Sequence, residues 1–390
     1  MKVSCAVYST VRSVSWLAAM VLVDVLSAER AVPEQHLHTP ESLEHCSGFL
    51  SREEQLHAAP LVILAYLTDF PQHSWMLGVS AADRELPLLL VGQGRRWTGP
   101  IGKLWGIARA AQVLSHVVPT KPIVVLDGID TFVANGLSDM AHATLRAIGR
   151  SASSVLVSTE CNLWPQCSRK YQFRTEVQAH RTCRKEGWPS CYPNGGAYTA
   201  SARGLMRFAS LQLAMHETSK ANTPNATASW VGSNDQYILQ SIYLQQDAGS
   251  HNLTIDVDGP GEVFLSLMPC SFHRGRRGLN CFDKAWAPME YVQANETTRE
   301  VAFTLNSSRQ LPLILHSNAD PQYARWHTSA LRPAWRHLFP PGKRLLEHRV
   351  LLLDSAIGGA CAAANLGELL RHGHNGSTRP WDAKRTFGGG

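Results

Sequence analysis

The chain has 390 residues, which is enough for one large α/β domain or two smaller ones. Hydrophobic residues make up 44% of it and charged residues 17%, a balance that suits a globular fold and argues against broad disorder. The net charge of +6 comes with scattered arginines and no long basic run, which favours small anionic ligands over nucleic acid.

The first 28 residues have the pattern of a secretory signal peptide. An apolar segment, Val14 to Val23, is followed by small residues that end at Ala28 as a cleavage site. An uncleaved membrane anchor is the alternative, although the segment is short for a bilayer span and Asp24 interrupts it. No other stretch predicts a membrane span. Residues 29–57 are polar and contain Pro and His, which predicts a stem or linker.

Cysteine and asparagine patterns agree with passage through the secretory pathway. Nine cysteines occur, and because Cys5 lies in the predicted signal, an even number remains to form disulfide bridges. Zinc binding is the alternative, but no two cysteines are spaced Cys-x-x-Cys. Glycosylation sequons begin at Asn225, Asn252, Asn295, Asn306 and Asn375. We therefore expect the mature chain in the lumen of the endoplasmic reticulum or Golgi, or secreted.

Short apolar runs alternate with helical patterns from residue 61 onward. Apolar runs predict strands at 61–67, 86–91, 123–126, 131–134, 154–158, 255–258, 262–265 and 311–315. Helical spacing of apolar residues predicts helices at 104–118, 140–148 and 237–244. Alternation of this kind predicts an α/β fold in which helices flank a parallel or mixed sheet.

Two carboxylates follow the apolar run at 123–126. Asp127 comes directly after it, and Asp130 follows one turn later. Because ligands in open α/β sheets bind beyond the carboxyl ends of the strands, this pair predicts a site for manganese or magnesium that carries a substrate diphosphate. The alternative is an ordinary turn with two solvated aspartates.

Three loops add candidate residues. The Gly-rich loop at 92–103 can let backbone approach a phosphate that Lys103 reaches, although it matches neither the P-loop nor the dinucleotide fingerprint. The run beginning at Asn194 either allows close backbone contact with a ligand or forms a hairpin turn. Asn234 and Asp235 are either site residues or caps of the helix that follows them.

The order of these motifs resembles the glycosyltransferase domain of the multifunctional lysyl hydroxylases, which are procollagen galactosyl- and glucosyltransferases. The series is Gly94-x-x-Trp97, Asp127-x-x-Asp130, Ser158-x-Glu160-Cys-x-x-Trp164-Pro165, Asn194-Gly-Gly, Asn234-Asp235-Gln236 and His316-x-Asn318. The resemblance implies a glycosyltransferase domain over residues 58–330 and a C-terminal extension, partly disordered, over 331–390.

The resemblance also implies a GT-A-like Rossmann-type fold that uses manganese and a UDP-sugar. Asp127, Asp130 and His316 correspond to the metal ligands. The donor-binding positions are Trp97, Lys103, Asn194 and Asn318, and the positions nearest the transferred sugar and acceptor are Glu160, Trp164, Asn234 and Asp235. The expected reaction moves glucose or galactose from UDP to a hydroxylysine-type, collagen-like acceptor or to another secretory glycoprotein.

Two residues depart from the family's pattern. Ile129 stands where the family has an aromatic residue that stacks on uracil, and Asn234 stands where the family has an acidic residue. The alternative function is therefore a catalytically inactive GT-A-like module that binds sugar or a partner protein.

Overall fold

The computed structural model describes residues 54–68, 75–160, 192–222, 234–246, 249, 251–266, 292–295, 299–305, 308–316, 347–355, 359–366 and 369. The predicted signal peptide, nearly all of the predicted linker, and every cysteine proposed for a bridge except Cys361 lie outside these residues. Within them, no helix combines the length and the apolar character that crossing a bilayer requires.

A mixed sheet forms the core, with the strand order β14-β13-β2-β1-β3-β6-β5-β7. The strands are β1 (Val62–Tyr66), β2 (Leu88–Val91), β3 (Pro122–Asp127), β5 (Ser154–Glu160), β6 (Tyr192–Ser201), β7 (Thr254–Val257), β13 (Arg349–Ser355) and β14 (Gly359–Asn365). β13, β2, β1 and β3 run parallel, whereas β6 is antiparallel to both β3 and β5. The predicted α/β class with a mixed sheet and flanking helices is confirmed.

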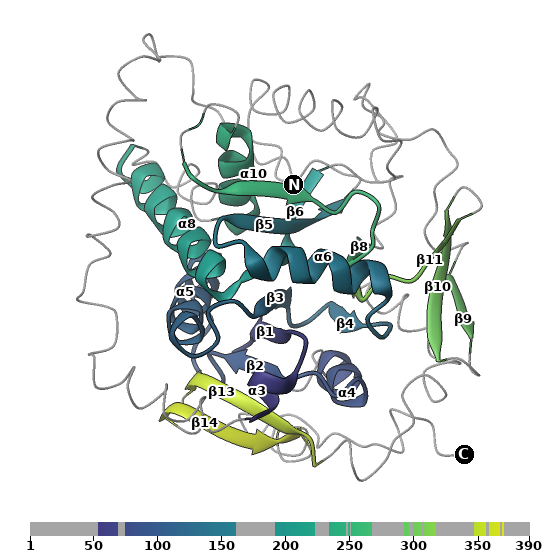
Figure 1. Cartoon of the computed structure of the whole chain (residues 1–390). Coiled ribbons are helices and arrows are strands. Elements are labelled where there is room, and N and C mark those ends of the chain that lie inside the picture. Colours follow the sequence, from purple (N-terminus) through teal and green to yellow (C-terminus); the bar gives the residue numbers. More distant parts are fainter. Residues whose placement is uncertain are drawn as a thin grey trace, which may run out of the picture.

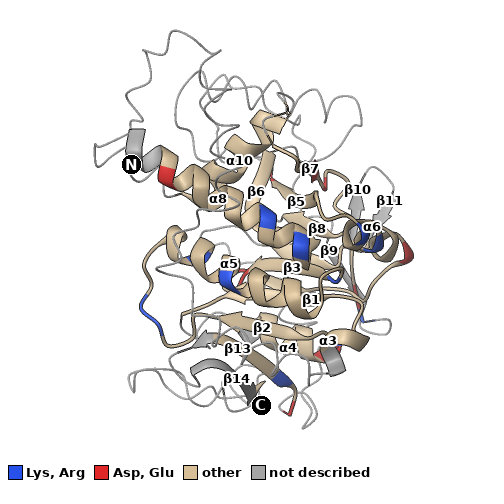
Figure 2. Ribbon diagram, turned by 60° about the vertical axis from the view of Figure 1, so that its left-hand side comes forward, with Lys and Arg blue, Asp and Glu red and all other residues tan. Residues whose placement is uncertain are grey.

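Helices cover both faces of this sheet (Figure 1). One face packs against α5 (Pro100–Val117), α8 (Ala202–Asn222) and α10 (Asp235–Gln245), and the other against α4 (Trp75–Asp83) and α6 (Asp139–Arg150). In β1, Val62 and Leu64 face the first set of helices, and Ile63 and Ala65 face the second. Burial on both faces explains why the central strands read as continuous apolar runs. Figure 2 shows α5 and α8 lying against each other from a second direction.

A small sheet sets the position of the last predicted metal ligand, His316. It consists of β4 (Thr131–Val133), β12 (Ile314–His316) and β8 (Phe264–Ser266), in the order β4-β12-β8. β4 follows directly on the turn after β3, and β12 pairs with it antiparallel, so that His316 lies opposite Thr131. This pairing carries His316 across more than 180 residues of sequence to the carboxyl end of β3.

Several elements differ from the sequence prediction. The Asn194-Gly-Gly run lies inside the continuous strand β6, so the predicted turn is wrong. The helices α4 and α8 were not predicted. Strands β13 and β14 come from the predicted C-terminal extension but belong to the main sheet, which therefore continues beyond residue 330. The remaining described elements are α3 (Glu54–Ala58) and a three-stranded sheet of β9 (Val292–Asn295), β10 (Glu300–Leu305) and β11 (Ser308–Gln310).

Asn135 ties the small sheet to β10. Its buried amide donates to the main-chain carbonyls of Val301 and Pro312, each at 2.8 Å, and its carbonyl oxygen accepts the Val301 N–H at 2.7 Å. Pro312 lies two residues before β12, so this side chain fixes the start of the strand that ends in His316.

We predict that Asn135→Ala lowers the free energy of unfolding by about 2–4 kcal/mol, because it leaves three buried backbone groups without partners. Chemical denaturation monitored by circular dichroism measures the loss. Met140→Ala is the control, since Met140 is 57% exposed and its truncation is expected to change stability by less than about 0.5 kcal/mol. Equal stability of the two variants would contradict the role of Asn135.

Candidate metal centre

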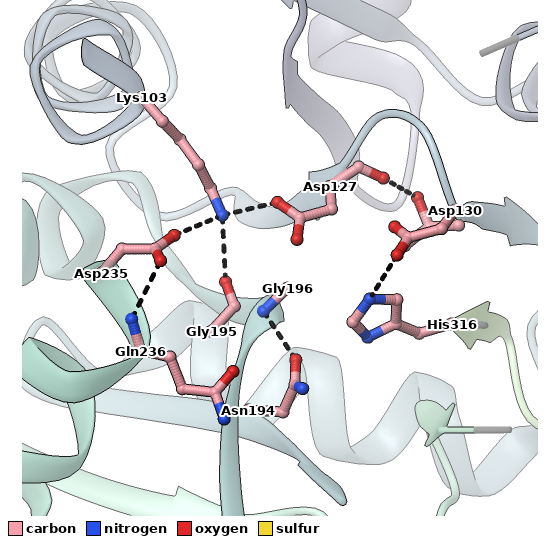
Figure 3. A network of polar contacts seen from close by, with 10 residues as sticks. Lys103, Asp127, Asp130, Asn194, Gly195, Gly196, Asp235, Gln236 and His316 are labelled. Carbon is pink, nitrogen blue, oxygen red and sulfur yellow. Dashed lines mark hydrogen bonds and ion pairs between the residues drawn. The ribbon is translucent and has the colours of Figure 1, made fainter. Parts of the chain in front are cut away.

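Asp127, Asp130 and His316 converge at the carboxyl end of β3. Each offers one ligand atom, and these atoms all lie within 4.8 Å of one another. Asp127 ends β3, Asp130 ends the turn that follows, and His316 ends β12 (Figure 3). The three residues that the sequence predicted as metal ligands are therefore brought together by the pairing of β12 with β4.

The imidazole of His316 is buried among carboxylates. Its Nε2 lies 3.4 Å from Oδ2 of Asp130, and only 3% of the side chain is exposed. Burial alone would lower the pKa of the imidazole, but Asp130, followed by Asp127 and Glu160, raises that pKa above its ordinary value. A proton and a metal cation would thus compete for the same nitrogen, so acidic pH would weaken metal binding.

The turn that carries the aspartates is held from two sides. The hydroxyl of Thr131 donates to the main-chain carbonyl of Asp127. A Cβ on Gly128 would lie 2.3 Å from Cγ of Leu67, so a glycine is needed where the turn passes β1. The spacing of the two carboxylates is therefore set by the backbone.

Strand β6 passes through a narrow space beside this group. A Cβ on Gly196 would lie 2.2 Å from Cε1 of His316, 2.6 Å from its Nε2 and 2.9 Å from Oδ2 of Asp127. On neighbouring Gly195, a Cβ would lie 3.2 Å from Cα of Gln236 in α10. Two consecutive glycines thus let the strand run between the candidate ligands and a helix, which is the physical reason for the Asn-Gly-Gly sequence.

The donor set fits a divalent cation. Two carboxylates and an imidazole suit manganese, iron or zinc alike, so the ligands support a metal ion without selecting one. Oδ2 of Asp127 and Nε2 of His316 both face the space that only a glycine at 196 leaves open. In the described part of the chain, Nδ1 of His316 has no hydrogen-bond partner.

Lys103 stands beside the metal ligands and joins them to helix α10. Its Nζ lies 2.5 Å from Oδ1 of Asp127, 2.7 Å from Oδ2 of Asp235 and 3.3 Å from the main-chain oxygen of Gly195 (Figure 3). Burial alone would lower the pKa of this ammonium, but Asp127 and Asp235 raise it well above its ordinary value. Lys103 is therefore a permanent cation in the site.

The start of α10 supplies two of the predicted residues. Asn234 is the N-cap, and its side chain accepts the Tyr237 N–H at 2.9 Å, as the capping alternative expected. Asp235 is the first helical residue, and its Oδ1 accepts the Gln236 N–H at 3.0 Å. Oδ2 of Asp235 also bonds to Lys103, so the same carboxylate contacts the first turn of its own helix and the ammonium beside the candidate metal ligands.

Glu160 and Asn194 lie on the two strands beside this network. Glu160 ends β5, is buried, and accepts a hydrogen bond from the side-chain amide of Gln236. The side-chain oxygen of Asn194 accepts the N–H of Gly196 at 2.7 Å, which braces the glycine pair in β6. Trp164 and Asn318, the other predicted site residues, lie outside the described residues.

Exposed apolar side chains lie at the same edge of the sheet. Trp97 is 53% exposed, and its ring is tilted against that of Tyr66 with the centroids 5.8 Å apart. Tyr66 ends β1 and is the register partner of Asp127 in β3. Ile129, between the two aspartates, is 55% exposed. Trp97 and Ile129 therefore expose apolar surface, Ile129 between the two aspartates and Trp97 beside the register partner of Asp127.

Sequence reasoning missed three parts of the site. Tyr66 was read only as part of a strand, although an aromatic residue at a strand's carboxyl end was a signal for it. The structural role of Gly196 was hidden because the glycine pair was interpreted as a turn or a ligand contact. The sequence marks Gln236 only as the third residue of the Asn234-Asp235-Gln236 motif, whereas in the structure its side-chain amide holds Glu160.

Comparison with known proteins finds neither a protein-family model nor a curated protein that matches this chain.

We predict that Gly196→Ala weakens binding of a divalent cation, because the new Cβ must displace His316 or Asp127. Titration of manganese, followed by the loss of its free electron-paramagnetic-resonance signal, is expected to show at least about tenfold weaker binding. Gly136→Ala is the matched control, since a Cβ there meets nothing within 4 Å. Unchanged manganese affinity in a folded Gly196→Ala protein would contradict this view of the site.

Proposed function

We propose that this chain is a metal-dependent glycosyltransferase with a GT-A-like fold. It transfers glucose or galactose from UDP-glucose or UDP-galactose to a hydroxylysine-type, collagen-like acceptor or to another secretory glycoprotein. The observation that carries the proposal is the convergence of Asp127, Asp130 and His316 beside the Lys103–Asp235 pair at the carboxyl edge of the sheet. A ligand with a diphosphate and a flat nucleobase matches the cation site and the exposed apolar side chains next to it.

Three side chains hold the metal ion in this proposal: Asp127, Asp130 and His316. The bound ion, taken to be manganese, supplies electrostatic stabilisation for the negative charge that develops on the departing UDP. The exposed ring of Trp97, which packs against the half-buried ring of Tyr66, offers a surface for the base beside Asp127.

Two carboxylates of the chain serve the transferred sugar and the acceptor hydroxyl. Asp235 lies in the first turn of α10, and Lys103 holds its Oδ2 at 2.7 Å. It is therefore the stronger candidate for orienting the acceptor hydroxyl or for stabilising positive charge on the sugar. Glu160, which Gln236 holds in a buried position, is the second candidate for these roles.

An inactive module that binds sugar or protein is the second candidate function. One observation favours it: the side chain of Asn234, where the resembling family has an acidic residue, is engaged as a helix cap. The same arrangement leaves Asp235 in the charged network, so a carboxylate remains for catalysis. Release of UDP from a UDP-sugar separates the two functions, because a binding module does not hydrolyse its ligand.

We predict that the wild-type protein releases UDP from UDP-glucose or UDP-galactose with manganese and that EDTA stops the release. Asp127→Asn is expected to reduce the rate by more than about 100-fold, because the ion that balances the leaving diphosphate loses a charged ligand. Asp139→Asn, on the exposed start of α6, is the control and should act like wild type. Undiminished release by Asp127→Asn, or in EDTA, would disprove the metal-dependent transferase.

We also predict that Ile129→Tyr tightens the binding of UDP several-fold. An aromatic face at this exposed position adds stacking on the base, of the order of 1–3 kcal/mol before the cost of ordering the side chain. Calorimetric titration of UDP with manganese measures the gain, and pyrophosphate, which has no base, is the control ligand. If UDP affinity does not rise while circular dichroism shows an intact fold, Ile129 does not face the base.

A further inference from the structure

The hydrogen-bonding capacity of Lys103 is fully used within the chain. A lysine ammonium has three N–H donors and no acceptor. Oδ1 of Asp127, Oδ2 of Asp235 and the main-chain oxygen of Gly195 lie within 3.3 Å of its nitrogen. The sequence motif had indicated that Lys103 contacts a diphosphate, but no donor remains for one in this arrangement.

We propose that Lys103 is a positioning residue that couples the metal ligand Asp127 to the catalytic candidate Asp235, and that it does not bind the donor's diphosphate. The inference deepens the proposed function and rests on it for the role of Asp235. The coupling itself is a property of the folded chain that is measurable without any substrate.

The two oxygens of Asp127 have separate partners. Oδ1 faces the ammonium of Lys103, whereas Oδ2 faces the space next to Gly196 and His316 where the candidate metal ligands converge. A carboxylate that is held by one oxygen presents the other at a fixed angle. Lys103 therefore makes Asp127 a one-oxygen metal ligand of defined orientation, in the way that hydrogen-bonded neighbours orient the ligands of many metal sites.

Asp235 is fixed by the same cation. Its Oδ2 bonds to Lys103 and its Oδ1 to the N–H of Gln236, so neither oxygen is free to rotate away. Because Lys103 touches both aspartates, it sets the position of Asp235 relative to the metal ligands. The distance between the leaving group and the group that orients the acceptor is thus determined by one side chain from α5.

Burial makes this coupling hard to exchange for a contact with a ligand. The Lys103 side chain is 8% exposed, and the Tyr198 ring beside it is fully buried. Turning the ammonium toward a phosphate would leave the half-buried Asp235, whose side chain is 18% exposed, without its partner, whereas Asp127 is 37% exposed and meets water more readily. Removing one partner from a buried ion pair is strongly unfavourable, so the intramolecular contacts are preferred.

A double-mutant cycle on the melting temperature tests the coupling without substrate. Lys103→Met and Asp235→Asn are each expected to lower the melting temperature, Lys103→Met by at least about 5 °C. The double variant should be no less stable than Lys103→Met alone, because Asp235 then has no charge left to compensate. Two decreases that add in full would overturn the proposal.

Lys121 provides the matched control for this cycle. Its ammonium bonds to the main-chain oxygens of His57 and Ala59, at 2.9 and 2.7 Å, and these contacts involve no carboxylate. The effects of Lys121→Met and Asp235→Asn should therefore add.

If Lys103→Met does not fold, the triple variant Lys103→Met/Asp127→Asn/Asp235→Asn, which removes all three charges, is expected to fold. Its failure to do so would overturn the proposal.

Ligand binding separates the positioning role from a diphosphate contact. With saturating manganese, Lys103→Met is expected to bind UDP and uridine each within about threefold of wild type, while the rate of UDP release falls by more than about 100-fold. Lys103→Arg, which keeps the charge, should recover part of that rate. A loss of UDP affinity of more than about tenfold, with uridine affinity unchanged, would overturn the proposal because it would reveal a phosphate contact. If the wild type binds no UDP, the proposed function fails and the melting-temperature cycle still decides whether Lys103 couples the two aspartates.

Discussion

Charge balance at the carboxyl end of β3 is the constraint on which the geometry of the site depends. Four carboxylates of described residues, those of Asp127, Asp130, Glu160 and Asp235, act on one ammonium and one imidazole. Buried charges of one sign are tolerated only when opposite charges compensate them. Lys103 compensates Asp127 and Asp235, and on the other side Asp130, Asp127 and Glu160 raise the pKa of His316, which favours a proton on that imidazole. The site is thus built to hold positive charge at two neighbouring points.

The sheet around the site makes this concentration of charge possible. β3 brings Asp127, β12 brings His316, β6 passes between them and α10, and α5 brings Lys103. Among the described residues, the apolar clusters on the two faces of the sheet contain none of the candidate metal ligands and neither member of the Lys103–Asp235 pair. The scaffold can therefore carry polar groups at one edge, as ligand sites in open α/β sheets do.

Local patterns in the sequence were sufficient for the central strands and for Asp127, because a strand buried on both faces reads as an apolar run that ends at a polar residue. Local patterns did not predict helix α8. They also did not predict β6, because Asn194-Gly-Gly has the composition of a turn, whereas the structure needs glycine there for the close approach of His316. The sequence places Lys103 in a loop that can approach a phosphate, but it cannot reveal that Asp235, 132 residues later, lies 2.7 Å from its ammonium. Contacts between distant segments depend on strand register, which local propensity does not determine.

The central part of β6 shows that stability does not explain this arrangement. Glycine within a strand weakens it by roughly 0.5–1 kcal/mol relative to alanine, and β6 has two in succession at positions that face His316 and α10. Buried ion pairs are likewise weak evidence for stability, since apolar residues of similar size often serve as well. The chain nevertheless places the glycine pair of β6 and the ion pairs of Lys103 beside each other. The candidate ligands exclude every larger side chain from position 196. Departures from local rules that coincide at one edge of a sheet are characteristic of functional sites, and here they leave open the space beside the candidate metal ligands.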